Sequence, residues 1–179
     1  MSYIRKNIFA VLRGNIVCGW NRLLQKCRYK NPIRLFHSVE IDIDKGAKLF
    51  FGGGVAIGAC SSCVVRSGGE LNFGNKVAFN SGCKIVCHQK IQIGDNTIFG
   101  PNVLIYDHDH IFDCETGVKR KEYKCSEIVI GKNCWIGANT VILRGTHIGD
   151  NCVIGAGCVI KGDFESGSRI IQKRVTEIK

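Results

Sequence analysis

The chain has 179 residues, a formal net charge of +10 and eleven cysteines. This length fits a single domain. No apolar run approaches the roughly 20 residues that a membrane-spanning helix needs, which excludes that class of protein. An odd cysteine count, without paired spacings or a signal-peptide pattern, excludes a disulfide scaffold and predicts a cytoplasmic location.

The first 39 residues carry much of the positive charge, with eight Lys or Arg and no acidic residue. Their apolar residues are spaced as in one or two amphipathic helices, with a weak point at Gly14 and Asn15 and a stop at Pro32. We expect a basic helical arm over residues 1–36. Two interpretations stay open: contact with the inner, anionic face of a membrane, or packing across the open end of the next domain with a basic outer face. A nucleic-acid partner is not expected, because no binding module is recognisable.

A strict six-residue period dominates the later part of the chain. Its aliphatic positions are Ile130, Ile136, Ile142, Ile148, Ile154 and Ile160. Helices repeat every 3.6 residues and half-buried strands every 2, so a period of six indicates a short strand and a turn, repeated as a solenoid. Three units make one triangular coil, and equivalent residues of successive coils then lie about 4.8 Å apart. Asn or Gly recurs where the turn needs a positive φ: at Asn133, Asn139, Asn151 and Gly157.

The period extends backwards with interruptions. Earlier coils are predicted at Phe51, Ile57 and Cys63, at Phe73, Phe79 and Ile85, and at Ile93, Phe99 and Ile105. The last two of these coils are 20 residues apart, whereas three six-residue units make 18. This difference places a two-residue bulge near Gln89. A smaller insertion falls at Gly68 and Gly69.

The largest interruption is a 19-residue polar excursion between Ile105 and Ile130, YDHDHIFDCETGVKRKEYK. Long loops on rigid scaffolds are usually functional. We therefore expect an all-β solenoid domain over residues 37–165 with a protruding loop at 106–124. A C-terminal segment, residues 166–179, should pack on the solenoid.

Several cysteines fall at positions of the repeat, where a free thiol acts as a small buried hydrophobe. They are Cys83, Cys134, Cys152 and Cys158. Cys60 and Cys63 spell C-x-x-C, but no second pair accompanies them. We therefore interpret both as small core residues rather than as zinc ligands.

Two segments, IGDNTIFGPNVLIYDHDH and IGKNCWIGANTVILRGTHIGDNCVIGAGCVI, resemble the hexapeptide-repeat acyltransferases. They are most similar to the maltose and galactoside acetyltransferases and to the sugar O-acetyltransferases of polysaccharide biosynthesis. The resemblance implies a left-handed parallel β-helix, acetyl-CoA as co-substrate, no metal, and a homotrimer with active sites between subunits. The segment 171–175 departs from the family's closing motif, because it lacks both Gly and Pro.

The resemblance also implies roles for individual residues. Counting from Pro101-Asn102-Val103, the family's catalytic base falls at His110, with His108 as the competitor. The expected acceptor-binding residues are Asn80, Tyr106, Asp107, His108 and Asp109. The expected coenzyme-binding residues are Trp135, Gly137, Ala138, Ala156, Lys161, Lys173 and Arg174. Ala138 and Ala156 are also expected to stack in successive coils, and the backbone N–H of Ala138 is the predicted oxyanion donor.

The expected function is acetyl transfer to a sugar hydroxyl of a bacterial surface-glycan precursor, such as capsule, exopolysaccharide or lipopolysaccharide. A xenobiotic (antibiotic) acetyltransferase and a nucleotide-amino-sugar N-acetyltransferase are the alternatives. Two further classes stay open: a non-catalytic scaffold, and a γ-type carbonic anhydrase. The latter needs three converging histidines, for which the candidates are His88, His108, His110 and His147.

Overall fold

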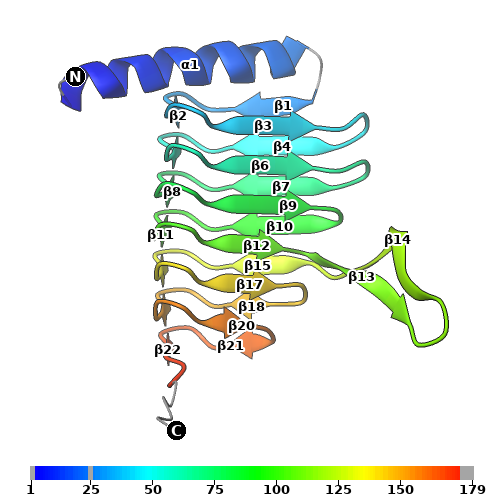
Figure 1. The fold of residues 1–179 in the computed structure, drawn as a ribbon. Helices are drawn as coiled ribbons and strands as arrows, with labels where there is room; N and C mark the ends of the chain where they lie inside the picture. The colour runs from blue at the N-terminus through cyan, green and yellow to red at the C-terminus, as the bar shows by residue number, and fades with distance from the viewer. Residues whose placement is uncertain (1–2, 24–25, 174–179) are drawn as a thin grey trace, which may run out of the picture.

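A computed structural model describes residues 3–23 and 26–173 of the chain. Its main body is a three-sided stack of parallel strands, and one helix, α1 (Tyr3–Leu23), lies across the N-terminal end of the stack (Figure 1). Each coil contributes a strand to sheet A, then to sheet B, then to sheet C. This is the parallel β-helix of hexapeptide repeats that the six-residue period predicts.

The strands of the three sheets alternate along the chain. Sheet A contains β1 (Cys27–Tyr29), β4 (Lys48–Phe51), β7 (Glu70–Phe73), β10 (Lys90–Ile93), β15 (Ile128–Ile130), β18 (His147–Ile148) and β21 (Asp163–Phe164). Sheet B contains β2 (Arg34–Leu35), β5 (Ala56–Ile57), β8 (Ala78–Phe79), β11 (Ile98–Phe99), β16 (Trp135–Ile136), β19 (Val153–Ile154) and β22 (Arg169–Ile170). Sheet C contains β3 (Glu40–Ile43), β6 (Ser62–Val65), β9 (Lys84–Cys87), β12 (Leu104–Tyr106), β17 (Val141–Leu143) and β20 (Val159–Ile160).

The strand registers confirm both the period and its interruptions. Ile136 pairs with Ile154, one regular coil later. Phe73 pairs with Ile93 across the predicted two-residue bulge. Ile105 pairs with Ile142 across the excursion. The insertions therefore lie at corners of the triangle, and the strands stay aligned.

The turns have the backbone conformation that their residues predict. Asn133, Asn139 and Asn151 have φ values of 56–58°, and Gly157 has a φ of 71°. This left-handed region is accessible to Gly and tolerated by Asn. Side-chain amides of successive turns also join, since Asn133 Nδ2 donates to Asn151 Oδ1 at 3.2 Å.

The core is a continuous column of inward-pointing side chains. All six Ile residues of the regular repeat are at most 3% exposed. In earlier coils aromatic rings fill the same space, with the rings of Phe79 and Phe99 stacked at 4.0 Å between centroids. Cys83, Cys134, Cys152 and Cys158 are buried as predicted. Cys60 is exposed at a turn with φ 57°, so its interpretation as a core residue is wrong.

The N-terminal arm differs from the prediction in two ways. α1 is continuous through Gly14, where a break was predicted. The glycine serves close packing instead, because a Cβ at this position would lie 2.2 Å from the carbonyl oxygen of Ile33. Pro32 does not stop the helix, which ends at Leu23. Before and after Pro32, β1 and β2 already pair with the second coil. The strands of the solenoid thus run from 27 to 170, beyond the expected limits of 37 and 165.

The excursion is an ordered antiparallel hairpin rather than an irregular loop. It consists of β13 (His108–Asp113) and β14 (Gly117–Cys125), and it projects from the solenoid where sheet C passes into sheet A (Figure 1). We call this edge the hairpin corner. We call the edge between sheets B and C, which carries the turns after β16 and β19, the Ala138 corner.

Among the described residues, no helix is both long and apolar enough to cross a membrane.

Candidate active site

Asp107 is a buried carboxylate at the start of the hairpin, with no exposed surface. It accepts hydrogen bonds from the backbone N–H groups of His88, Gln89 and Lys90 at 2.8, 2.8 and 2.9 Å. These amides belong to the turn that the two-residue bulge creates in the preceding coil. Because the carboxylate is enclosed and both of its oxygens accept backbone hydrogen bonds, it does not face an acceptor as predicted. It holds the start of the hairpin against the preceding coil.

Two imidazole rings lie next to this carboxylate, tilted by 37° to each other. His88 and His108 occupy equivalent places in successive coils, and their ring centroids are 4.0 Å apart. The Nδ1 atom of His108 is buried, lies 3.4 Å from Asp107 Oδ1, and makes no hydrogen bond with the described residues. Burial and the neighbouring His108 lower the pKa of His88 below its ordinary value of 6.5.

Tyr123 joins these rings to the exposed His110. Tyr123 lies opposite His110 in the hairpin, and the two ring centroids are 4.7 Å apart. The same phenol ring lies 4.3 Å from His88 and 5.4 Å from His108. Tyr106 completes the cluster, with its ring 6.0 Å from His108. The hairpin corner therefore brings together four of the predicted residues, Tyr106, Asp107, His108 and His110, around a tyrosine.

An ion pair ties the base of the hairpin to the solenoid. The Nε atom of Arg144, in the turn after β17, donates to the carboxylate of Asp109. The Arg144 side chain is only 15% exposed. Asp109, predicted to bind an acceptor, thus has a partner within the chain that holds the hairpin in place.

Sequence reasoning assigned no site role to three residues of this corner. His88 was considered only as a metal ligand, although its 20-residue offset from His108 equals the displacement of the two coils. Arg144 carried no signal beyond its charge. Tyr123 carried none either, because the register of a hairpin cannot be counted from a six-residue period.

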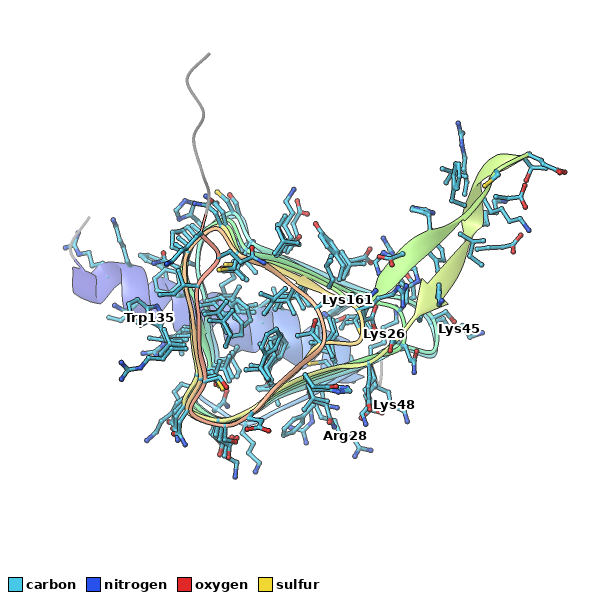
Figure 2. The ribbon with its side chains drawn as sticks, turned by 90° about the horizontal axis from the view of Figure 1, so that it is seen from below. Lys26, Arg28, Lys45, Lys48, Trp135 and Lys161 are labelled. Carbon is cyan, nitrogen blue, oxygen red and sulfur yellow. The ribbon has the colours of Figure 1, made fainter. Side chains whose placement is uncertain are left out.

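Four of the predicted coenzyme residues, Trp135, Gly137, Ala138 and Ala156, lie on the other side of the prism. Trp135 is 56% exposed on the outer face of sheet B, on the side away from the hairpin (Figure 2). Gly137 lies against Gly155 of the next coil, and a Cβ on Gly137 would lie 2.5 Å from the nitrogen of Ala156. Ala138 and Ala156 follow at the Ala138 corner. Their backbone N–H groups make no hydrogen bond with any residue that the structure describes, while the Ala138 carbonyl accepts the N–H of Gly157 at 2.7 Å.

A groove of about 1040 Å³ opens nearer the N-terminal end, between α1 and the outer surface of sheet B. Asn80 lies in it, at the same corner as Ala138 but in an earlier coil, and its Oδ1 accepts the N–H of Ser81 at 2.8 Å. The helix contributes Lys6, Phe9 and Arg13 to the lining. Asn80 is therefore not close in sequence or in space to the hairpin of its own chain.

The predicted basic residues are divided between the two corners. Lys161 follows β20 at the hairpin corner, in the column of Leu143. Lys173 follows β22 and is exposed, and Arg174 lies outside the described residues. In place of the absent Gly-Pro segment, the side-chain amide of Gln172 pairs with both backbone groups of Val159, at 2.8 and 2.7 Å. This side chain covers the last strand edge of sheet C.

The histidines do not form a recognisable metal centre. Within residues 3–23 and 26–173, no group of three or more His, Cys, Asp or Glu side chains is placed to hold a metal ion. The rings of His88 and His108 are in contact, with centroids 4.0 Å apart. His147 is instead paired with Asp163, at 2.7 Å.

Comparisons with known proteins agree with this fold. The family model for bacterial transferase hexapeptide (six repeats) matches residues 127–162. Galactoside O-acetyltransferase of Escherichia coli (strain K12) is 38% identical over 96 residues, covering 54% of this chain and 47% of that protein. The putative lipopolysaccharide biosynthesis O-acetyl transferase WbbJ of the same strain is 25% identical over 138 residues, covering 60% of this chain and 70% of WbbJ. The chain spans less than half the length of most of the curated relatives that it matches.

Among solved structures, a mutant of AntD is similar over most of its length. AntD is an N-acyltransferase from Bacillus cereus, and this structure holds it in complex with dTDP-4-amino-4,6-dideoxyglucose and coenzyme A. The TM-score is 0.72 over 90% of this chain and 87% of that chain, at 14% identity, so the likeness concerns the fold.

The three-sided solenoid has the left-handed parallel β-helix fold, and residues 127–162 carry the hexapeptide repeat of bacterial transferases. In sequence, the chain resembles bacterial sugar O-acetyltransferases, among them those for galactosides and for lipopolysaccharide.

Proposed function

We propose that this protein transfers an acetyl group from acetyl-CoA to a sugar hydroxyl of a bacterial surface-glycan precursor, with His110 as the general base. The observation that carries the proposal is the pairing of two features. One is an exposed imidazole on a rigid hairpin, and the other is a straight column of small residues with unpartnered amides. The similarity to galactoside and lipopolysaccharide O-acetyltransferases supports a sugar as the acceptor.

The Ala138 corner fits an extended thiol arm. The N–H groups of Ala138 and Ala156 have no partner in the described chain, and both are donors that a bound ligand would satisfy. Their small side chains leave room for a chain to lie along the corner. Acetyl-CoA would supply a reactive thioester there, and the exposed Lys173 follows the last strand on the same side for the coenzyme's phosphates.

His110 would take the proton of the attacking hydroxyl. A hydroxyl is a weak nucleophile at neutral pH, and histidine exchanges protons readily in that range. His110 is exposed and lies against Tyr123, which orients the ring. His108 is a poorer candidate because its ring is enclosed between His88 and Asp107. The N–H of Ala138 would donate to the carbonyl oxygen that gains negative charge during attack.

One chain does not bring the proposed base and the proposed oxyanion donor together, because His110 and Ala138 lie at different corners of the prism. A homotrimer resolves this, since in a ring of three copies the hairpin of one copy faces the next copy's Ala138 corner. We therefore propose that each active site is formed by two subunits. The cytoplasm is the proposed location, and the eleven free cysteines are compatible with its reducing conditions.

The groove beside Asn80 is the proposed place for part of the acceptor. It lies along the same corner as Ala138, nearer to the N-terminus. Its lining combines apolar side chains, such as Phe9 and Ile98, with the polar amide of Asn80. Such a mixture suits a sugar attached to an apolar carrier better than a free disaccharide. The apolar side chains would contact the carrier, while the amide would form hydrogen bonds with the sugar.

The test is acetyl-CoA consumption with a panel of sugar, nucleotide-amino-sugar and antibiotic acceptors, for the wild type and for His110→Ala. We expect acceptor-dependent consumption with sugar hydroxyls and a loss of about 10²–10⁴ in kcat for His110→Ala. His147→Ala, at an exposed histidine of sheet A that pairs with Asp163, serves as the control. Equal rates for wild type and His110→Ala would contradict the assigned base. Turnover of an amino sugar or an antibiotic alone would contradict the proposed acceptor.

A further inference from the structure

α1 presents its large apolar residues to the outside. The face against the solenoid consists of small residues, with Ala10, Gly14 and Cys18 buried. The opposite face carries a stripe of side chains that are 52–76% exposed, at Ile8, Phe9, Leu12, Ile16, Trp20 and Leu23. Phe9 lies at the edge of this stripe, where it also lines the groove between α1 and sheet B. At 100° per residue these positions cover about a third of the helix circumference. A surface helix normally exposes its polar face, so this arrangement is the reverse of the usual one.

The helix is held firmly in this orientation. Gly14 fits against the backbone of Ile33 so closely that no other residue could replace it without movement. The guanidinium of Arg13 donates to the carbonyl oxygen of Val39 at 3.0 Å. Cys18 belongs to the hydrophobic core of the solenoid. The apolar stripe therefore cannot turn inward without undocking the helix.

The charge around the stripe is entirely positive. Lys6 and Arg13 flank it on one side and Arg22 on the other, and the chain has no acidic residue before Glu40. Below the helix, the first two coils add Lys26, Arg28, Lys45 and Lys48, which lie along one side of the prism (Figure 2). Among the acidic residues of the first coil, Glu40 is exposed, and Asp42 and Asp44 are paired with Arg66.

We propose that the outer face of α1 binds the surface of an anionic lipid bilayer. A flat apolar stripe with cationic flanks inserts its side chains about 5–10 Å into the headgroup region, while the basic residues meet lipid phosphates. The first coils would lie roughly 5–10 Å outside the headgroup region, within a Debye length of the membrane surface. Their basic residues would therefore add to the attraction between the protein and the anionic lipids. A second copy is a poorer occupant, because self-contact through this face would bring like charges together.

This contact does not depend on acetyl transfer. It would, however, place the groove beside Asn80, which opens directly beneath α1, close to the plane of the lipid headgroups. The two activities can therefore be tested separately.

The test is co-sedimentation of the full chain with vesicles of equimolar phosphatidylglycerol and phosphatidylcholine, and with pure phosphatidylcholine, at low ionic strength. Ile16→Glu puts a charge in the stripe at a 72% exposed position. Ile171→Glu makes the same change at a 76% exposed position at the far end of the solenoid. We expect the wild type to bind only the anionic vesicles, with affinity reduced about tenfold or more by Ile16→Glu and little changed by Ile171→Glu.

A second measurement reports on the helix itself. In a Trp135→Phe background, Trp20 is the remaining tryptophan. Its emission should shift to the blue on addition of anionic vesicles. Equal binding to both vesicle types, or equal loss in the two Glu variants, would overturn the proposal. The proposal would also be overturned if the wild type bound no vesicles and Ile16→Glu changed the mass of the protein in solution. That result would show that this face is a contact between copies of the chain.

Discussion

The carboxylate of Asp107 accepts the backbone N–H of Gln89 at 2.8 Å. This hydrogen bond joins the two places where the six-residue period fails, because Gln89 lies in the two-residue bulge and Asp107 begins the hairpin. The bulge thus supplies the amides that fix the start of the hairpin, and the two insertions act as one unit. The orientation of the proposed base depends on that unit.

Replacing this carboxylate should cost stability. Asp107→Ala leaves three partly buried N–H groups without an acceptor, and we expect the free energy of unfolding to fall by about 2–4 kcal/mol. Asp109→Ala removes a more exposed ion pair with Arg144, and its cost should stay below about 1 kcal/mol. Urea denaturation of both variants measures the difference. A cost for Asp107→Ala no greater than that for Asp109→Ala would contradict the role assigned to the buried carboxylate.

Tyr123 should act as a positioning residue for His110. Tyr123→Ala removes the ring that contacts the imidazole at 4.7 Å, so we expect kcat to fall by about tenfold. Tyr123→Phe keeps the ring and should restore most of the activity. If the phenylalanine variant were as slow as the alanine variant, the hydroxyl rather than the ring would be the group that matters.

The docking of α1 can be tested with two glycines of the same helix. Gly14→Ala would place a Cβ 2.2 Å from the Ile33 carbonyl oxygen, whereas at Gly19 the nearest atom is 3.7 Å away. Alanine has the higher helix propensity, by about 1 kcal/mol. We therefore expect Gly19→Ala to be neutral or slightly stabilising, and Gly14→Ala to loosen the helix. Amide hydrogen exchange of residues 3–23 measures this, and equal protection in the two variants would contradict the packing described.

His88 should make stability depend on pH. Its pKa is lowered in the folded state by burial, and also by His108 and Arg66, while Asp107 and Asp44 oppose the shift. The unfolded chain then binds protons more readily than the folded chain. Stability is therefore full above about pH 6.5 and falls as the pH drops from there toward the folded pKa. Thermal melts of His88→Gln should show less of this decrease than the wild type. An unchanged pH dependence in His88→Gln would show that other groups cause it.

Much of the solenoid could be predicted because the repeat is local. Each Ile, Asn or Gly reports on its own strand or turn, so the spacing between Phe79 and Phe99 already gave the register that pairs them. The limits of the domain were harder to predict. Tyr29, Leu35 and Ile41 keep the six-residue spacing and pair with Phe51, Ile57 and Cys63 of the second coil. The first coil was assigned to the arm instead, because the basic and apolar residues before it favoured a helix up to Pro32.

The candidate site was predictable only in part, for a different reason. His110 could be counted from Pro101, but its surroundings depend on contacts between segments far apart in sequence. Tyr123 meets His88 because a hairpin folds back over the coil, and Arg144 meets Asp109 across 35 residues. No local pattern carries such pairs. The sequence likewise left open whether the apolar face of α1 points inward or outward, because which face docks depends on the backbone of Ile33.

The proposed active site combines the hairpin of one subunit with the Ala138 corner of another, and mixed trimers test this claim most directly. His110→Ala removes the proposed base, and Ala138→Trp blocks the proposed coenzyme track, so each variant alone should be inactive. When the two are unfolded together and reassembled in equal amounts, about one quarter of the sites should combine an intact hairpin with an intact corner. We predict recovery of roughly that fraction of the wild-type acetyl-transfer rate. No recovery in trimers shown to contain both variants would contradict a site shared between subunits.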